Sequence, residues 1–274
     1  MKQLYILAAL LLGLNLGVRA QSVITVSGDI SANTTWTSNN IYLLSGFVYV
    51  TNNAELTIEP GTVIKGDKAT KGSLIITRGS KIWADGTSSA PIVFTSNEPV
   101  GTRTYGDWGG LIVLGKASIN DPAGEKVIEG GVDPVKGLYG GTDDADNSGT
   151  LRYVRIEFPG IAFQPNNEIN GLTLGGVGNG TTIDYVMVSF SGDDAFECFG
   201  GTVNAKHLIS YRTLDDDFDT DFGFRGKMQF LVALRDSNVA DVSGSNGFES
   251  DNDATGSNNN PLTQPIYSNV TIIG

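Results

Sequence analysis

Acidic side chains recur in one short motif that appears four times in the second half of the chain. The motif reads Asn or Asp, a usually small residue, a large apolar residue, a polar residue and a smaller side chain. Its copies are residues 170–174, 194–198, 216–220 and 246–250. The polar fourth position is acidic in three copies, at Glu197, Asp219 and Glu249. Carboxylate oxygens at one position of a stacked repeat would form a line of ligands for a hard cation such as Ca²⁺.

Two further stretches carry part of a calcium-loop pattern. Residues 144–149 and 251–256 each place oxygen-bearing side chains at positions 1, 3 and 5 and glycine at position 6. The glutamate expected at position 12 is missing, because Arg155 and Leu262 stand there. We therefore expect Ca²⁺ on one acidic edge, although solvated acids in turns would give the same pattern. The candidate ligands are Asp144, Asp146, Asp194, Glu197, Asp216, Asp219, Glu249, Asp251 and Asp253.

The first position of the motif has a structural interpretation that we favour. It is occupied by Asn170, Asp194, Asp216 and Asn246. Asn and Asp tolerate left-handed backbone conformations and hydrogen-bond their own backbone, so they recur as ladders at the corners of repeats. Asp194 and Asp216 are thus expected to be corner residues first and metal ligands second.

The spacing of the motif determines which elements must position these residues. A unit that recurs roughly every 20–30 residues cannot bury its own apolar face, so it must stack on copies of itself. Residues 151–158, 183–190, 204–211 and 228–235 repeat with the same rhythm and alternate apolar and polar side chains. This pattern predicts a parallel β-helix whose rungs lie ~4.8 Å apart. Its interior columns are expected to be Phe196/Phe218/Phe248, Val154/Val186/His207/Leu231 and Ile156/Val188/Ile209/Ala233.

The chain divides into three parts. Residues 1–20 read as a secretory signal, with Lys2, an apolar stretch and a Val18-Arg19-Ala20 cleavage site. Residues 21–40 are predicted to cap the first rung, and residues 41–274 to form the β-helix. Residues 116–149 are the least regular, which indicates a long excursion from the rungs. The apolar strand at 270–274 has no cap after it, so the chain is expected to be a fragment.

Charge and composition exclude several functions. The chain has 30 Asp and Glu against 18 Lys and Arg, a net charge of −12, which argues against nucleic acid and anionic membranes as partners. After the signal no segment is apolar and long enough to span a membrane. The single cysteine, Cys198, excludes an intrachain disulfide, and its column neighbours predict a small core residue. A secreted or cell-surface monomer is expected.

Several motifs resemble a family of secreted bacterial right-handed parallel β-helix proteins. They are residues 58–64, 84–87 with 91–96, 107–111, 149–155 and 199–204. The resemblance covers most of residues 40–274 and implies the fold, whereas members are mostly uncharacterised in function. It also implies the surface of a Gram-negative bacterium, because many members resemble type IX secretion cargo with a C-terminal sorting domain. Nothing like that domain is present in this sequence.

A catalytic role is the alternative. Gly192-Asp193-Asp194 resembles the paired aspartates of polygalacturonase-like hydrolases, in which one carboxyl protonates the leaving group and another activates water. The glycine-flanked histidine of those enzymes is missing, and His207 is interpreted as a core residue. A calcium-assisted lyase would need a basic residue near the acidic edge. Arg212, Arg225 and Arg235 are the candidates.

Aromatic residues suggest glycan binding instead. Six of them could line a groove that stacks sugar rings, namely Tyr105, Trp108, Tyr139, Tyr153, Tyr185 and Phe224. Tyr153 and Tyr185 align on the strand face opposite Val154 and Val186, so outward stacking is expected for this pair. We therefore expect an exported scaffold for adhesion or glycan binding, stabilised by Ca²⁺, with a lyase or hydrolase of acidic polysaccharide as the alternative.

Overall fold

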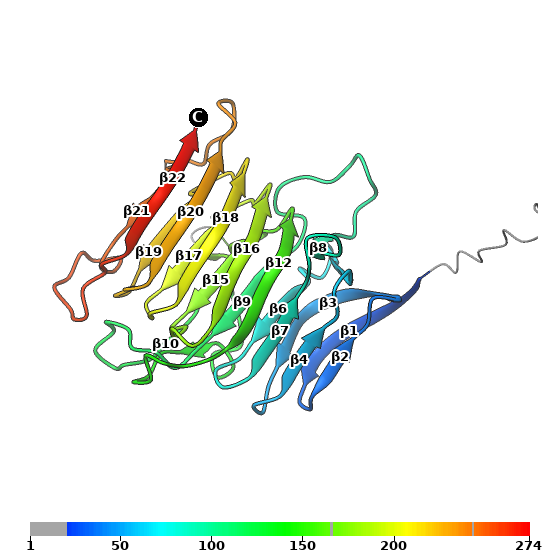
Figure 1. The fold of residues 1–274 in the computed structure, drawn as a ribbon, viewed down its shortest axis with the longest axis horizontal. Helices are drawn as coiled ribbons and strands as arrows, with labels where there is room; N and C mark the ends of the chain where they lie inside the picture. The colour runs from blue at the N-terminus through cyan, green and yellow to red at the C-terminus, as the bar shows by residue number, and fades with distance from the viewer. Residues whose placement is uncertain (1–20, 165–166, 243) are drawn as a thin grey trace, which may run out of the picture.

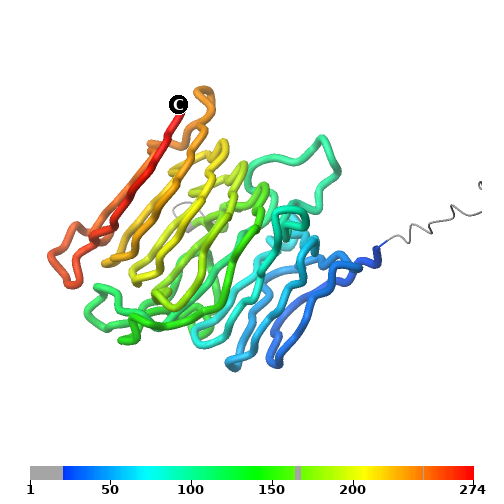
Figure 2. The backbone as a smooth tube through the Cα atoms, in the orientation of Figure 1, coloured from blue at the N-terminus to red at the C-terminus, as the bar shows by residue number. Residues whose placement is uncertain are grey.

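A computed structural model describes residues 21–164, 167–242 and 244–274, so the predicted signal sequence lies outside the described residues. Every regular element in these ranges is a β-strand, and strands of successive coils pair in parallel along the molecule (Figures 1 and 2). The same ranges hold no helix that is long and apolar enough to cross a membrane. The predicted parallel β-helix is confirmed.

One side of the β-helix is a single ladder of strands, which we call the roofed ladder. It consists of β1 (Ser22–Ile30), β3 (Asn40–Val50), β6 (Ser73–Ile76), β9 (Leu111–Leu114), β15 (Leu172–Gly175), β17 (Phe196–Phe199), β19 (Phe218–Asp221) and β21 (Glu249–Ser250). On its inner face Phe218 stacks between Phe196 and Phe248, with ring centroids 5.5 Å apart on each side. Cys198 is fully buried, directly opposite Thr220 on the next strand. The predicted interior stack of phenylalanines and the predicted core position of Cys198 are both confirmed.

The other sides of the coil are formed by paired short strands at first and by single bent strands later. The short strands are β2 (Thr34–Trp36), β4 (Glu55–Ile58), β5 (Val63–Gly66), β7 (Lys81–Asp85) and β8 (Ile92–Ser96). The bent strands are β12 (Gly149–Glu157), β16 (Thr182–Ser189), β18 (Asn204–Tyr211), β20 (Lys227–Leu234) and β22 (Ile266–Ile273). Because β12 pairs with β7 in its first half and with β8 in its second, each bent strand replaces two short ones and must turn a corner.

A residue in the left-handed region makes each corner. Five residues in successive bent strands have φ between 50° and 61°, namely Tyr153, Tyr185, His207, Phe230 and Asn269. Left-handed backbone in a non-glycine residue costs about 1–3 kcal/mol unless the surroundings stabilise it. The corner residue lies outside the paired register, and pairing resumes after it, from Val154 to Val186.

The observed pairing of β18 differs from the predicted interior columns. Val186 pairs with Leu208, and Leu208 with Leu231, so Leu208 and not His207 lies inside. The predicted alignment of β18 was wrong by one residue, which also placed Ile209 inside. Ile209 is 40% exposed, and the buried Ser210 takes its place. The slip arose because a one-residue shift exchanges the two faces of a strand, and β18 alternates too weakly in polarity to exclude it.

Residues at the start and middle of the chain complete the architecture. Residues 21–40, predicted as a cap, form β1 and β2, which pair in parallel with β3 and β4. The excursion at residues 116–149 carries a short antiparallel pair, β10 (Lys126–Val127) and β11 (Leu138–Tyr139). A second hairpin, β13 (Ala162–Gln164) and β14 (Asn167–Glu168), follows β12.

Candidate functional site

The acidic positions of the repeated motif form one column on the outer face of the roofed ladder. Thr173 pairs with Glu197, Glu197 with Asp219, and Asp219 with Glu249. We call these four residues the acid column. Their side chains point away from the core, as predicted, because they alternate with the inward rings of Phe196 and Phe218. Outward does not mean exposed, however, since Thr173 is 1% and Glu197 7% exposed.

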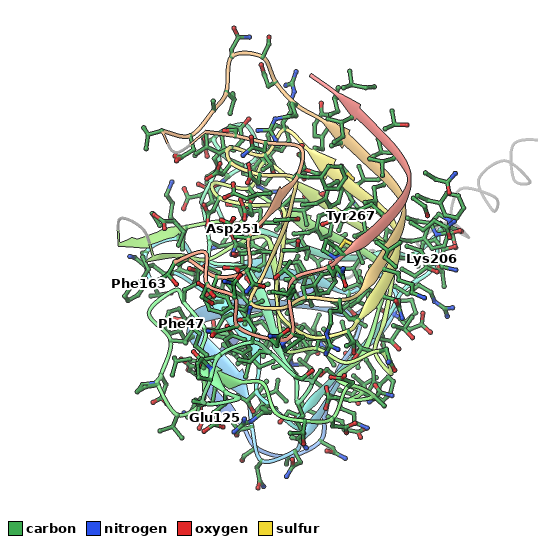
Figure 3. All side chains as sticks on the ribbon, turned by 90° about the vertical axis from the view of Figure 1, so that its left-hand side faces the viewer. Phe47, Glu125, Phe163, Lys206, Asp251 and Tyr267 are labelled. Atoms are coloured by element: carbon green, nitrogen blue, oxygen red, sulfur yellow. The ribbon has the colours of Figure 1, made fainter. Side chains whose placement is uncertain are left out.

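The excursion covers this face as a roof. In the early coils the outer column of the roofed ladder is apolar, with Ile75 and Ile112 in register. A second hydrophobic cluster forms on it, in which Ile128 and Tyr139 of the excursion pack against these residues. Figure 3 places Phe47 and Phe163 on this side of the molecule and Lys206 on the opposite side. Apolar burial therefore holds the excursion over the ladder, and the acid column continues the same column beyond the apolar part.

The excursion brings one further carboxyl to the acid column, at Glu129. The amide of Asn170 donates one hydrogen bond to Glu129 Oε1 at 3.3 Å and a second one to the carboxylate of Glu197. Asp194, Glu197 and Asp219 each place a carboxylate oxygen within 4.8 Å of the other two. Glu129, Asp194, Glu197 and Asp219 form what we call the acid cluster. Glu129 was missed in the sequence because it belongs to an irregular segment with no repeat to align it.

Burial and mutual repulsion make the charged form of these carboxyls costly. Burial raises the pKa of Glu129 to about 7 and that of Asp219 to about 7. Burial, and then the charge of Glu129, raises the pKa of Glu197 well above its ordinary value. Burial, and then the charge of Asp193, has the same effect on Asp194. None of the four makes an ion pair with Lys or Arg in the part of the chain that the structure describes.

The first motif position forms the predicted corner ladder. Asn170 Oδ1 accepts the backbone N–H of Asp194 at 3.2 Å, and Asp194 Oδ1 accepts that of Asp216 at 2.9 Å. The carboxylate of Asp216 in turn accepts the N–H of Asn246. The side chains thus bond to the backbone of the next rung and not, as was expected, to their own. None of the four has a positive φ, so the left-handed geometry expected for them is also wrong. Burial raises the pKa of Asp216 to about 8.

The remaining predicted ligands lie outside the acid cluster. Asp144 accepts hydrogen bonds from Ser118 and pairs with Arg225 Nη2 at 3.1 Å. Asp146 accepts the Ser148 hydroxyl at 3.0 Å. Neither belongs to a group of three described carboxylates with oxygens within 4.8 Å of one another. Hydrogen bonds and an ion pair with other protein groups therefore occupy the carboxylates of the loop at 144–149.

The same holds for the second calcium-like loop. Asp253 Oδ1 accepts hydrogen bonds from Thr255 and Ser257, and hydrogen bonds from Ser257 and then Thr255 lower the pKa of Asp253. Asp251 is exposed, as is Glu249 at the open end of the acid column. The structure thus brings Asp194, Glu197 and Asp219 together, and the carboxyls of Asp216 and Glu249 share a hydrogen bond. Outside these two groups lie Asp144, Asp146, Asp251 and Asp253.

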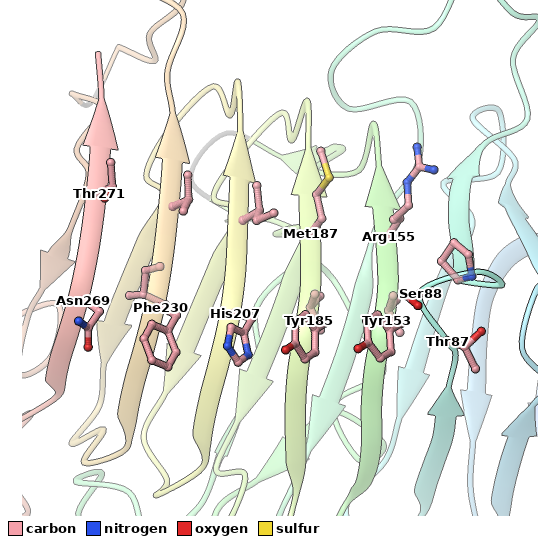
Figure 4. Close-up of a pocket in the computed structure, with 16 residues that line it drawn as sticks. Thr87, Ser88, Tyr153, Arg155, Tyr185, Met187, His207, Phe230, Asn269 and Thr271 are labelled. Carbon is pink, nitrogen blue, oxygen red and sulfur yellow. The ribbon is translucent and has the colours of Figure 1, made fainter.

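A groove of about 660 Å³ runs across the bent strands on another face of the β-helix (Figure 4). Along it Tyr153, Tyr185, His207 and Phe230 stack in sequence, with centroids 4.6, 4.2 and 4.9 Å apart and planes within 10° of parallel. We call these four residues the aromatic column. Parallel rings this close must overlap, so Tyr185 and His207 have both faces covered. The predicted outward stacking of Tyr153 and Tyr185 is confirmed, but a sugar ring cannot lie flat on Tyr185.

A second column of outward residues forms the other wall of the groove. It contains Arg155, Met187, Ile209, Val232 and Thr271, which pair in register across the bent strands. Arg155 pairs with Glu157, and His207 Nδ1 lies 2.8 Å from Asp184 Oδ1. Among the described residues that line the groove there is no carboxylate. The groove is therefore largely apolar, with hydroxyl, amide and imidazole groups at its edges.

The other aromatic candidates do not reach the groove. Trp108, Tyr139 and Phe224 are almost completely buried, so their proposed sugar-stacking role is wrong. Tyr105 packs edge-on against Phe190. Sequence reasoning also missed Phe230. The predicted alignment of β20 with β16 gave Phe230 the same position in its strand as Tyr185, so it could have been found.

The residues suggested for catalysis do not converge. Asp193 and Asp194 lie beside the acid column, and burial raises the pKa of Asp193 to about 8. The candidate bases are engaged elsewhere. Arg225 pairs with Asp144, and Arg235 Nη1 lies 2.8 Å from the buried Asp217. Arg212 lies 3.7 Å from Asp236.

Comparison with known families agrees with the fold and assigns the chain to one family. The family model of the pectate-lyase-like β-helix domain matches residues 28–274. The chain belongs to this family. No curated protein and no solved structure matches the chain. Membership of the pectate-lyase-like β-helix family fits a surface β-helix protein as well as an enzyme that acts on polysaccharide, so the sites themselves must decide between these functions.

Proposed function

We propose that this chain is an exported β-helix scaffold that binds a neutral linear glycan in the groove over its bent strands. The aromatic column carries the proposal, because it presents ring edges and polar groups at the spacing of the strands along an open groove. The signal-like sequence at residues 1–20 supports export.

The chemistry of the groove suits a sugar polymer. Carbohydrate rings offer apolar C–H faces and a rim of hydroxyls, and a site for them combines apolar walls with a few placed polar groups. Met187, Ile209 and Val232 provide the apolar wall. Tyr hydroxyls and the Asn269 amide can exchange hydrogen bonds with sugar hydroxyls. Successive sugar units would lie across successive strands.

Charge favours a neutral glycan over an acidic one. The chain carries a net charge of −12, which repels polyanions at long range. The single guanidinium among the described residues that line the groove, at Arg155, is already paired with Glu157. A calcium-assisted lyase would need a cation and a base in the groove, and the acid cluster lies on a different ladder. These observations favour binding over catalysis.

Affinity electrophoresis of the purified chain tests the proposal. We expect hydroxyethylcellulose, xylan or laminarin in the gel to retard the chain, and polygalacturonate to have no such effect. Phe230→Ala and Ile209→Ser should each weaken binding by about tenfold, because both residues face the groove and are partly exposed, so folding is retained.

Phe163→Ala serves as the matched control, because Phe163 packs against Phe47 on the roofed side, and it should bind like the unchanged chain. Retardation by none of the neutral polymers, or equal retardation of the groove variants, would overturn the proposal. An ultraviolet-absorbing unsaturated product from polygalacturonate would establish the lyase alternative instead.

A further inference from the structure

We propose that a Ca²⁺ ion bound in the acid cluster fastens the excursion onto the roofed ladder. The site would draw carboxylate oxygens from Asp194, Glu197 and Asp219 of the ladder and from Glu129 of the excursion. This inference is independent of the glycan groove, which lies on a different face.

The geometry of the cluster fits a cation with several oxygen ligands. Oxygens of Asp194, Glu197 and Asp219 lie within 4.8 Å of one another, a spacing that a central ion with ligand distances of about 2.3–2.6 Å can bridge. Asn170 links the carboxyls of Glu129 and Glu197 through its amide and so holds the two segments together around this point. Every candidate ligand is an oxygen, which selects a hard cation.

A second observation is that two buried oxygens beside the acid cluster have no hydrogen-bond partner among the described residues. Thr173 stands directly opposite Glu197 on the same outer face, and it is 1% exposed. Its hydroxyl oxygen has no hydrogen-bond partner among the described residues, and neither has the buried Oδ1 of Asp219. Buried polar atoms are rarely left without a partner, because each such atom loses its hydration. Thr173 lies on the strand before Glu197 and Asp219 on the strand after it, so a cation held at Glu197 would supply that partner.

The placement of Glu129 gives the ion a structural role. Glu129 follows Ile128, which is buried in the second hydrophobic cluster, and lies between β10 and β11. Apolar contacts hold the excursion over the early coils and end at β17, where Tyr139 packs against Phe199. The acid cluster lies beside this last apolar contact. Without a cation, like charges would push Glu129 away from Glu197. With a cation bound, the same carboxyls would hold the excursion against the roofed ladder.

Thermal unfolding and proteolysis test the site in the purified chain. Relative to EDTA, millimolar Ca²⁺ should raise the melting temperature by about 5–10 °C, and Mg²⁺ should have a smaller effect because it gives up its water reluctantly. Trypsin should cut after Lys126 and Lys136 at least about tenfold more slowly with Ca²⁺ than with EDTA, because the closed roof must open locally before it can be cleaved.

Variants separate this site from other acidic groups. Glu129→Gln and Glu197→Gln retain the shape of the side chain and remove a charge, so the chain should fold but lose both calcium effects. Glu125→Gln is the control, because Glu125 lies in the same excursion and pairs with Arg78 outside the cluster. The proposal fails if Ca²⁺ changes neither readout, or if the Gln variants at 129 and 197 respond like the control. Either failure would leave the glycan groove unaffected.

Discussion

Leu208→Ala is expected to lower the free energy of unfolding by about 2–5 kcal/mol, the usual cost of removing a buried leucine side chain. Leu208 is 1% exposed and lies in the core between Val186 and Leu231. His207→Ala, its neighbour on the opposite face, should cost about 0.5–1.5 kcal/mol through lost ring stacking. Urea unfolding followed by circular dichroism measures both changes.

The adjacent pair of variants is its own control. Both replace a larger side chain by alanine in the same strand, so any difference arises from the face on which each side chain lies. Equal destabilisation by the two substitutions would contradict the register of β18. A larger loss from His207→Ala would restore the interior histidine that the sequence alone predicted.

In EDTA the chain should become less stable as the pH rises from about 5 to 8. The folded-state pKa values of Asp193 and Asp216 are raised to about 8, and those of Glu129 and Asp219 to about 7, in each case chiefly by burial. In the unfolded chain these groups titrate near 4. Between the two values the folded state binds protons that the unfolded state has lost, so stability is present at low pH and is lost as the pH rises towards 8.

We estimate the size of this effect from the pKa shift of a single group. The clustered carboxyls titrate as a set, so their individual shifts cannot be added. A shift of about three pKa units corresponds to about 4 kcal/mol, or roughly 8–16 °C in melting temperature for a chain of this size. Differential scanning fluorimetry at several pH values measures it. Glu129→Gln combined with Asp219→Asn should flatten the dependence. A melting temperature that rises steadily between pH 5 and 8 in EDTA would refute the expectation.

The repeated motif was sufficient to predict the second half of the roofed ladder, from β15 to β21. The large apolar residue of each copy recurs with a polar residue beside it, and strand geometry sends neighbours to opposite faces. The alignment of Glu197 with Asp219 and Glu249 was therefore correct, as was the inward stack of Phe196 and Phe218. The bent strands were harder, because a left-handed corner residue such as His207 breaks the period of two.

The acid cluster illustrates what a repeat pattern leaves open. The pattern placed the acidic side chains outside the core, where solvent would be the default surroundings. Their burial depends on the excursion, whose path is set by apolar contacts with Ile75 and Ile112 in distant coils. Glu129 reaches Glu197 only through that path, so no local rule could have paired them. Asp144 and Asp253 matched a calcium-loop pattern, yet hydrogen bonds from Ser118 and Ser257 occupy them.

The sequence by itself determined that this chain is a parallel β-helix with a column of acids on one outer face and tyrosines on another. These features follow from periodicity, because each rung buries its apolar side chains only against the next rung. Tertiary structure alone decided which outer faces are covered, which carboxyls meet, and that the aromatic rings stack on one another beside an apolar wall. Such contacts join residues distant in sequence, and they depend on how loops fold back over the strands rather than on local pattern.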